Sequence, residues 1–289
     1  MNLALRFPHV FTIQIKHLSC LRWQNGARFT FPRPHWADAG TSARQTLTGS
    51  LPTPRDAVGM GRMPRFDVSG VPQHIVQRGN NRLPCFLNDR DRLDYLHLLR
   101  DALTATSVRL HAYVLMDNHV HLLATPAGPG DLSRMMQKFG RQYVGLFNAR
   151  HHRTGTLWEG RYKACLVGDE RYFLTCQRYI ELNPVRARIT DDPVAYRWSS
   201  CAAHLGQRTG SMLTPHPAWL ALDANPIHRS SIWRGLLDEA LTEQQLDEIR
   251  QYLQQQRAWG RDDFRAMVEA KTSRFAGVRP AHRPSKRDK

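Results

Sequence analysis

The feature that most constrains the fold is a pair of short apolar segments joined by a two-residue turn. Residues 110–116 and 119–125 have strand length, and Asp117-Asn118 between them is a dipeptide that tolerates the left-handed backbone of a tight hairpin. Side chains alternate along a strand, so His119 and His121 point to one face and Val120 to the other. The sequence therefore predicts a β-hairpin that carries two imidazoles on one side.

This His-x-His pair alone is weak evidence of function. With 14 histidines in 289 residues, about 0.7 such pairs are expected by chance. Two imidazoles on a rigid strand suit half of a metal site, whereas the alternative is a pair of histidines in the core. Its meaning depends on which residues stand opposite the strand.

Two further strands are expected around the hairpin. Residues 73–77 form a short strand that ends at Gly79, and residues 164–167 form the last strand. In the first strand of the hairpin, alternation predicts one shared face for four residues: Leu110, Ala112, Val114 and Met116.

Three helices are expected between and after these strands. The first begins after Asn88, with Asp91 three residues on, and the third runs from Asp169 to Leu182, where Pro184 stops it. The second opens near Asp131 and buries a stripe of Leu132, Met135, Met136, Phe139, Tyr143 and Phe147. The order strand–helix–strand–strand–helix–strand–helix predicts an α+β fold, a split β-α-β sheet with helices on one face.

Composition divides the chain into three regions. Residues 1–62 contain five prolines and two acidic residues without a sustained period, so we expect an irregular extension and Met63 as the true start; the alternative is a functional N-terminal extension. Residues 63–206 hold the expected α+β domain. Residues 207–289 become helical and end in a basic, proline-containing tail that we expect to be disordered.

The charge of the chain points to a polyanionic partner. Lys and Arg number 41 against 25 Asp and Glu, which gives a net charge of +16, and nucleic acid is the simplest partner for such a chain. An anionic membrane is the competing interpretation, but no apolar run reaches transmembrane length. Five widely spaced cysteines without C-x-x-C, and no visible secretory signal, favour a reducing cytoplasm.

Two segments carry candidate DNA contacts. Arg134 and Lys138 lie on the exposed side of the second helix, which is either a phosphate-contacting ridge or a solvated face. The loop over 150–163 mixes basic and aromatic side chains, as phosphate contact and base stacking require, and its candidates are Arg153, Trp158, Arg161 and Lys163. The alternative for Trp158 is that it fills the core.

The third helix supplies residues that could stand opposite the histidines. Tyr179 and Asn183 are one turn apart on one helical face. If that face meets the hairpin, then His119, His121 and the Asn183 amide could bind a divalent cation that orients a phosphate for attack by Tyr179. The alternatives are a tyrosine at the edge of the core and an ordinary Asn-Pro helix terminator.

Five stretches in this order resemble a known family, the single-tyrosine HUH transposases of the insertion-sequence-200-like type, and more closely their REP-associated branch (bacterial tyrosine transposases linked to repetitive extragenic palindromes). The resemblance covers residues 63–206, half of the chain. The stretches are Val76-Gln-Arg-Gly-Asn-Asn81, Met116-Asp-Asn-His-Val-His-Leu122, Thr154-Gly-Thr-Leu-Trp-Glu-Gly-Arg-Tyr-Lys163, Arg178-Tyr-Ile-Glu-Leu-Asn-Pro-Val-Arg-Ala187 and Tyr196-Arg-Trp-Ser-Ser200.

The resemblance implies a ferredoxin-like fold of the HUH endonuclease type and a site that cleaves and rejoins single-stranded DNA at hairpin or palindromic repeats. His119 and His121 would bind Mg²⁺ or Mn²⁺, and Tyr179 would form a 5′-phosphotyrosine. The family's third ligand, often Gln, corresponds to Asn183, which is one methylene shorter. The protein would act as a monomer or homodimer on REP-like single-stranded DNA hairpins in the cytoplasm.

Two other functions remain as alternatives. The first is a catalytically silent regulator that binds DNA hairpins with the same fold. The second is a metal hydrolase that activates water at His119 and His121, which would not need Tyr179 and has no acidic residue in the histidine strand.

Overall fold

The computed structural model describes residues 64–209 and 211–280. The expected irregular extension over 1–62, the proposed start at Met63 and the end of the basic tail at 281–289 lie outside these residues. No helix in the two described ranges is both long enough and apolar enough to cross a membrane.

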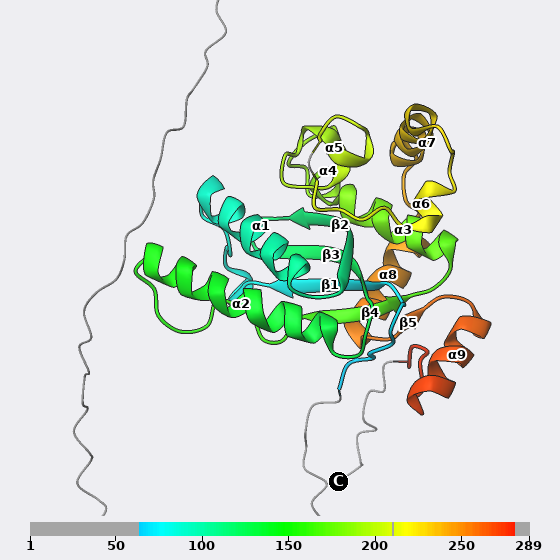
Figure 1. Ribbon diagram of the computed structural model, residues 1–289, viewed down its shortest axis with the longest axis horizontal. Coiled ribbons are helices and arrows are strands. Elements are labelled where there is room, and N and C mark those ends of the chain that lie inside the picture. The colour runs from blue at the N-terminus through cyan, green and yellow to red at the C-terminus, as the bar shows by residue number, and fades with distance from the viewer. Residues whose placement is uncertain (1–63, 210, 281–289) are drawn as a thin grey trace, which may run out of the picture. The chain divides into compact units, whose positions relative to one another are not determined.

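The expected order of elements is confirmed in the first half of the described chain (Figure 1). It runs β1 (Gln73–Arg78), α1 (Asp89–Thr104), β2 (Val108–Leu115), β3 (His119–Pro126), α2 (Asp131–Arg150), β4 (Lys163–Val167) and α3 (Glu170–Glu181). Local signals explain the helix starts, because Asn88 and Asp91 form a capping box on α1 and Asp169 caps α3.

After α3 the chain is mostly helical. Pro184 does not end the helical path, because the chain turns at Leu182 and Pro184 lies in the first turn of a new short helix. The elements are α4 (Asn183–Arg186), α5 (Cys201–His204), α6 (Pro217–Leu220), α7 (Pro226–Asp238), α8 (Glu243–Gln255), β5 (Ala258–Trp259) and α9 (Asp262–Thr272).

The strands form one sheet in the order β2-β3-β1-β4-β5. The pairs β2–β3, β3–β1 and β1–β4 are antiparallel, which is the expected split β-α-β arrangement, and β5 adds a parallel strand next to β4. This short fifth strand was not predicted, because two residues are too few to show the alternation of side chains that marks a strand.

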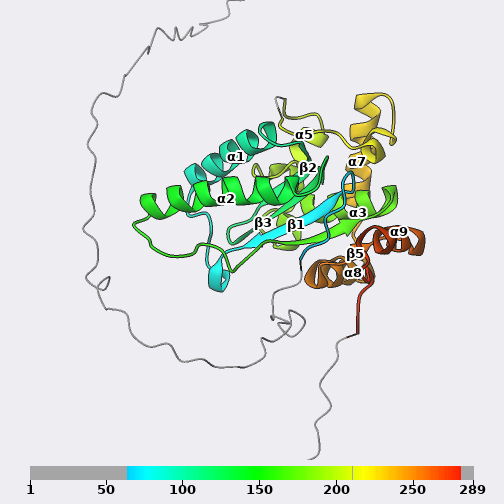
Figure 2. The same cartoon turned by 60° about the horizontal axis from the view of Figure 1, so that its bottom comes forward.

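Helices cover both faces of the sheet, so the prediction of helices on one face is wrong. One face packs against α1 and α2 through Ile75, Val120 and Leu122. The other face packs against α3 and the C-terminal helices, with Ala112 and Leu123 in the same cluster as Phe173 and Trp233. Figure 2 shows α1 and α2 on one side of the sheet and α8 on the other.

The predicted facing of the first hairpin strand is also wrong at one position. The pairing of β2 with β3 shifts between Leu110 and Ala112. Such an extra residue reverses the alternation, so Leu110 packs toward α1 and α2 while Ala112, Val114 and Met116 face α3. The sequence signals this bulge only weakly, because His111 between the two is an ordinary strand residue.

A buried carboxylate ties the C-terminal region to α3. Glu181 is fully buried and accepts hydrogen bonds from Ser200 Oγ (2.6 Å), His204 Nδ1 (2.6 Å) and Trp233 Nε1 (2.9 Å). These donors lie on α5, on α7 and in the segment before α5. The helices after residue 206 therefore share a core with the sheet.

Candidate active site

Strand pairing brings four polar side chains to one face of the sheet. His121 is paired with Val76 of β1, and His119 is paired with Arg78. On the other side of β1, Lys163 is also paired with Val76. Directly paired residues share a face, so His119, His121, Arg78 and Lys163 all project from the face opposite α1 and α2.

Helix α3 lies over this face and places Tyr179 against the histidines. The Tyr179 ring centroid is 5.7 Å from that of His121, and the centroids of His119 and His121 are 5.0 Å apart. Tyr179 and Asn183 each retain 8% exposure and line the same cavity as both histidines. The structure thus brings together the four residues that the sequence singled out for the metal and the nucleophile.

Hydrogen bonds orient the two imidazoles. Nδ1 of His119 lies 2.6 Å from Asn118 Oδ1, and Nδ1 of His121 lies 2.8 Å from Nε2 of His74. With Nδ1 engaged in each ring, Nε2 is the nitrogen left for a ligand. His74 was not singled out from the sequence, because nothing in a lone strand histidine marks its partner.

Burial keeps these rings uncharged. It lowers the pKa of His119 to about 4 and that of His121 well below its usual value, and nearby His74 and Arg78 act in the same direction on His121. A metal ion binds neutral imidazole, so the site is in the protonation state that a cation needs at neutral pH.

The donors present fit a divalent cation. The described residues contain no group of three or more His, Cys, Asp and Glu that could hold a metal, so a carboxylate- or thiolate-rich site is not available there. Two imidazoles and the Asn183 amide remain, and the Asn183 side chain has no hydrogen bond to the described protein atoms that would compete for its oxygen. A mixed nitrogen and oxygen set of this kind can bind a divalent cation and leave positions for a phosphate, and Mg²⁺ or Mn²⁺ is the choice that the family resemblance implies.

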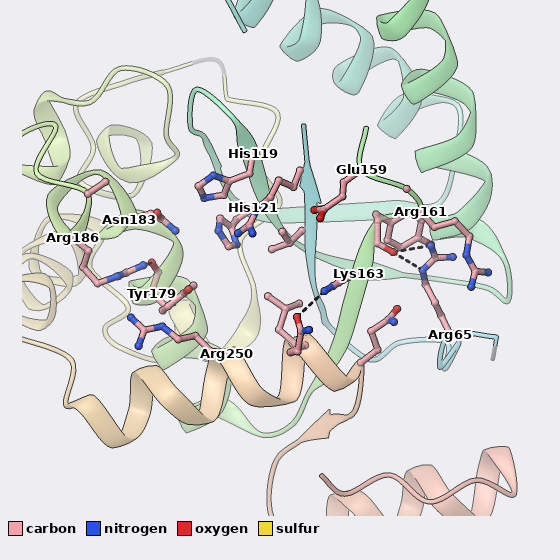
Figure 3. Close-up of a pocket in the computed structure, with 18 residues that line it drawn as sticks. Arg65, His119, His121, Glu159, Arg161, Lys163, Tyr179, Asn183, Arg186 and Arg250 are labelled. Atoms are coloured by element: carbon pink, nitrogen blue, oxygen red, sulfur yellow. Dashed lines mark hydrogen bonds between the residues drawn. The ribbon is translucent and has the colours of Figure 1, made fainter. Parts of the chain in front are cut away.

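The cavity around these residues has a volume of about 700 Å³ and a cationic lining (Figure 3). Six basic side chains contribute to it, against one acidic residue, Glu159, among the described residues of the lining. The basic residues are Arg65, Arg78, Arg161, Lys163, Arg186 and Arg250. Such a concentration of one charge favours a polyanion.

Arg186 is the basic residue in closest contact with Tyr179. Its guanidinium carbon lies 4.1 Å from the centre of the Tyr179 ring, and its Nη2 donates a 2.7 Å hydrogen bond to the Tyr179 carbonyl. Its Nη1 is buried without a hydrogen-bond partner, and burial lowers the pKa of the group. A desolvated guanidinium with an unused donor is a natural contact for an anion in the cavity.

The predicted DNA contacts divide into two groups. Arg161 and Lys163 line the cavity. Arg134 and Lys138 lie on α2, which covers the opposite face of the sheet, and Arg134 forms an ion pair with Asp131. The structure therefore does not bring this ridge to the candidate site, because α2 buries its other side against the far face.

The other two predicted contacts, Arg153 and Trp158, also lie away from the cavity lining. Arg153 lies with its guanidinium 5.5 Å from the Phe147 ring. Trp158 is only 7% exposed and stacks on Tyr143 with 6.0 Å between ring centres. The expectation that it offers a stacking surface is wrong for this conformation, since its ring fills the core as the alternative interpretation holds.

Several residues of the site were missed in the sequence. Arg78 and Arg186 fall inside stretches that carried the family resemblance, so their position in the motifs was a usable signal. Glu159 stands in the basic loop, where it was passed over. Arg250 comes from a region that the motifs do not cover, and no local pattern relates it to Tyr179.

Two solved structures are similar to parts of this chain. One solved structure, a REP-associated tyrosine transposase bound to a REP hairpin, is 16% identical, covers 55% of this chain and 93% of that chain, and has a TM-score of 0.45. A transposase-like protein from Deinococcus radiodurans R1 is 23% identical, covers 45% and 90%, and has a TM-score of 0.29. No curated protein matches the sequence.

The comparison with family models is more specific, because it concerns the segment that carries the site. Residues 67–183 match the model described as "Transposase IS200 like". The matched segment begins before β1 and ends at Asn183, so it contains both histidines, Tyr179 and the amide. Over residues 67–183, and so over the segment that holds the candidate site, the chain is similar to the IS200-like transposases.

Proposed function

We propose that the protein cleaves and rejoins single-stranded DNA through a covalent bond to Tyr179. The observation that carries the proposal is that Tyr179 and three candidate metal ligands line one cavity with a cationic wall. His119 and His121 through Nε2, and Asn183 through Oδ1, would hold Mg²⁺ or Mn²⁺. When bound, the ion would neutralise non-bridging phosphate oxygens and so reduce their repulsion of the nucleophile.

The covalent step uses residues of this chain. Tyr179 Oη attacks the scissile phosphorus, the new bond is a 5′-phosphotyrosine, and the bond from phosphorus to the 3′ oxygen breaks. The phenolic proton passes to a base, for which Glu159 is the carboxylate among the described residues of the cavity, and the departing oxygen takes a proton to become a 3′-OH. Reversal of these steps rejoins the strand, because the phosphotyrosine keeps the energy of the bond.

Arg186 positions Tyr179 for this step. Arg186 packs on the Tyr179 ring and holds its backbone carbonyl, so it fixes the nucleophile beside the place for the phosphate. The half-buried guanidinium would also stabilise the charge that develops on the phosphate. We propose single-stranded DNA next to a hairpin as the substrate, following the resemblance to the REP-associated branch.

A labelled hairpin tests the proposal. The protein is incubated with Mn²⁺ and a single-stranded DNA hairpin labelled at its 5′ or its 3′ end, and products are separated on a denaturing gel. We expect a covalent adduct that carries the 3′ label, and a released 5′-labelled fragment that ends in 3′-OH. Tyr179→Phe abolishes both products, whereas Tyr172→Phe, on the same helix but against Trp259, preserves them.

The alternatives give different outcomes in the same assay. Tight hairpin binding without cleavage would favour the regulator. The presence of Glu159 in the cavity gives the hydrolase a possible base, which the sequence did not show. Cleavage that survives Tyr179→Phe but is lost in Glu159→Gln would establish that hydrolase.

A further inference from the structure

Helix α8 forms a wall of the candidate active site although it lies beyond the residues that match the transposase family. Three of its residues line the cavity together with Tyr179 and both histidines: Arg250, Leu253 and Gln254. The sequence assigned no role to this part of the chain. Its position in the site therefore needs a functional explanation.

The wall is a fixed part of the fold. Thr242 and Gln245 form a capping box at the start of α8, which satisfies the first backbone donors of the helix. Leu246 and Ile249 are buried in the core cluster that contains Tyr179 and Phe173, and Leu253 packs on Val76 and Cys165 of the sheet. Burial of these three side chains fixes the rotation of α8 and hence which edge meets the cavity.

The edge of α8 that meets the cavity is polar. Arg250 and Gln254 are four residues apart and lie on the same side of the helix. Gln254 Oε1 accepts a 2.7 Å hydrogen bond from Lys163 Nζ, which links α8 to β4 across the cavity. Figure 3 shows Arg250 extending from α8 toward Tyr179 and Arg186.

The Arg250 guanidinium is available to bind an anion. Arg250 forms an ion pair with Asp247, at 3.1 Å one turn back, and the side chains are 53% and 75% exposed, so this pair is weak. The charge of Arg250 also disfavours the charged form of Arg186 and helps to lower the pKa of that group. Two guanidinium groups that repel each other across one cavity are both stabilised when a phosphate enters between them.

We propose that α8 binds the backbone of the DNA strand at a phosphate next to the scissile one, with Arg250 as the contact residue and Gln254 positioning Lys163 beside it. The inference rests on the proposed function in one respect, namely that the strand attacked by Tyr179 passes through this cavity. It assigns the C-terminal region to the DNA-binding site.

Binding measurements in the Tyr179→Phe background test the charge of Arg250 without turnover. Arg250→Gln should raise the Kd for a single-stranded hairpin about tenfold and reduce the slope of log K against log salt by about one, as expected for one lost phosphate contact. Lys271→Gln is the matched control, because it removes one positive charge from the exposed surface of α9 outside the cavity. Asp247→Asn should act in the opposite direction and tighten binding, since it releases Arg250 from its partner.

A phosphate scan identifies the contact directly. Each DNA phosphate near the cleavage position is replaced in turn by an uncharged methylphosphonate. At one position, the replacement should weaken DNA binding by the protein that retains Arg250. The same replacement should leave DNA binding by the Arg250→Gln variant unchanged, which is the coupling expected of two groups in contact. Arg250 is exposed, so thermal melting of the variant should match that of its parent.

The outcomes separate this inference from the proposed function. Equal effects of Arg250→Gln and Lys271→Gln, or a scan in which no phosphate couples to Arg250, would overturn the role of α8. The adduct assay with Tyr179→Phe is independent of both the binding measurements and the phosphate scan. Loss of the adduct in Tyr179→Phe together with no coupling at Arg250 would leave the tyrosine mechanism intact and remove α8 from the DNA site.

Discussion

His74 and His121 form a buried hydrogen bond between neighbouring strands, with 2.8 Å between His74 Nε2 and His121 Nδ1 and the two rings stacked at 5.1 Å. A histidine that binds a metal through Nε2 carries its proton on Nδ1, so in the proposed metal-bound state His121 would donate this bond and His74 would accept it. The proton of His74 then lies on its Nδ1, which is buried without a partner. We therefore propose that His74 supports the tautomer of His121 that can bind a metal.

Removing this acceptor should weaken metal binding. His74→Leu is expected to raise the Kd for Mn²⁺ at least about tenfold, the usual effect of losing such an outer hydrogen bond, while His74→Gln retains an acceptor near the Nε2 position and loses less. Titration of free Mn²⁺ by electron paramagnetic resonance gives the affinity without DNA. His97→Gln is the control on the exposed side of α1, and unchanged Mn²⁺ affinity in a folded His74→Leu protein would refute the role of His74.

Asn183 should contribute to metal affinity through its amide oxygen. Asn183→Ala is expected to raise the Kd for Mn²⁺ about tenfold, since one of three protein ligands is lost. Asn183→Gln should restore affinity close to that of the unaltered protein, because the longer amide extends into an open cavity. The same Mn²⁺ titration checks both variants, and an alanine variant with unaltered affinity would show that two histidines bind the ion without the amide.

Local signals made most of the fold predictable. The buried stripe of α2 was correct at every position from Leu132 to Phe147 because a helix with one apolar face has little choice of orientation. The caps at Asn88 and Asp169 fixed the starts of α1 and α3 for a similar reason. The bulge at His111 escaped prediction, because it depends on the pairing of β2 with β3 and not on the sequence of either strand.

The candidate site was predictable where it lies in family motifs and unpredictable where tertiary packing decides. His119, His121, Tyr179 and Asn183 could be named from two short stretches and do share one cavity. Trp158 was misjudged because a basic loop with an aromatic residue gives no information on whether that ring points inward. Arg250 could not be found at all, since the packing of α8 on α3 and β4 brings it near Tyr179.

Acid should destabilise the protein through His111, which is remote from the metal ligands. His111 is 2% exposed, its Nδ1 donates to the Thr214 carbonyl and its Nε2 accepts from Thr125 Oγ1. Burial lowers its pKa from 6.5 to about 4, and the charges of His216 and Arg109 add to the effect. Between these values the unfolded chain binds a proton that the folded chain does not, so stability is complete above pH 6.5 and falls as the pH drops toward 4.

The size of this loss can be measured by urea denaturation. For His111 alone, the free energy of unfolding should fall by about 2 kcal/mol between pH 7.5 and pH 5. His111→Gln keeps a donor and an acceptor but cannot take up the proton, so this variant should lose less stability over the same interval. An identical pH dependence in the two proteins would show that other groups cause the acid sensitivity.

The buried Glu181 should be the strongest single link between α3 and the C-terminal region. Its two oxygens accept hydrogen bonds from Ser200, His204 and Trp233. Glu181→Ala leaves these donors buried without an acceptor, and we expect a loss of about 3 kcal/mol or more in the free energy of unfolding. Trp233 places α7 on this anchor, and Leu246 and Ile249 of α8 share the core cluster of Trp233, so the DNA binding proposed at α8 should weaken as well. Glu181→Gln keeps the side-chain volume and one acceptor oxygen. It should therefore lose less stability than Glu181→Ala, and urea denaturation of both variants measures the difference. Equal stability of Glu181→Ala and the unaltered protein would show that the helices after residue 206 are held by apolar packing alone.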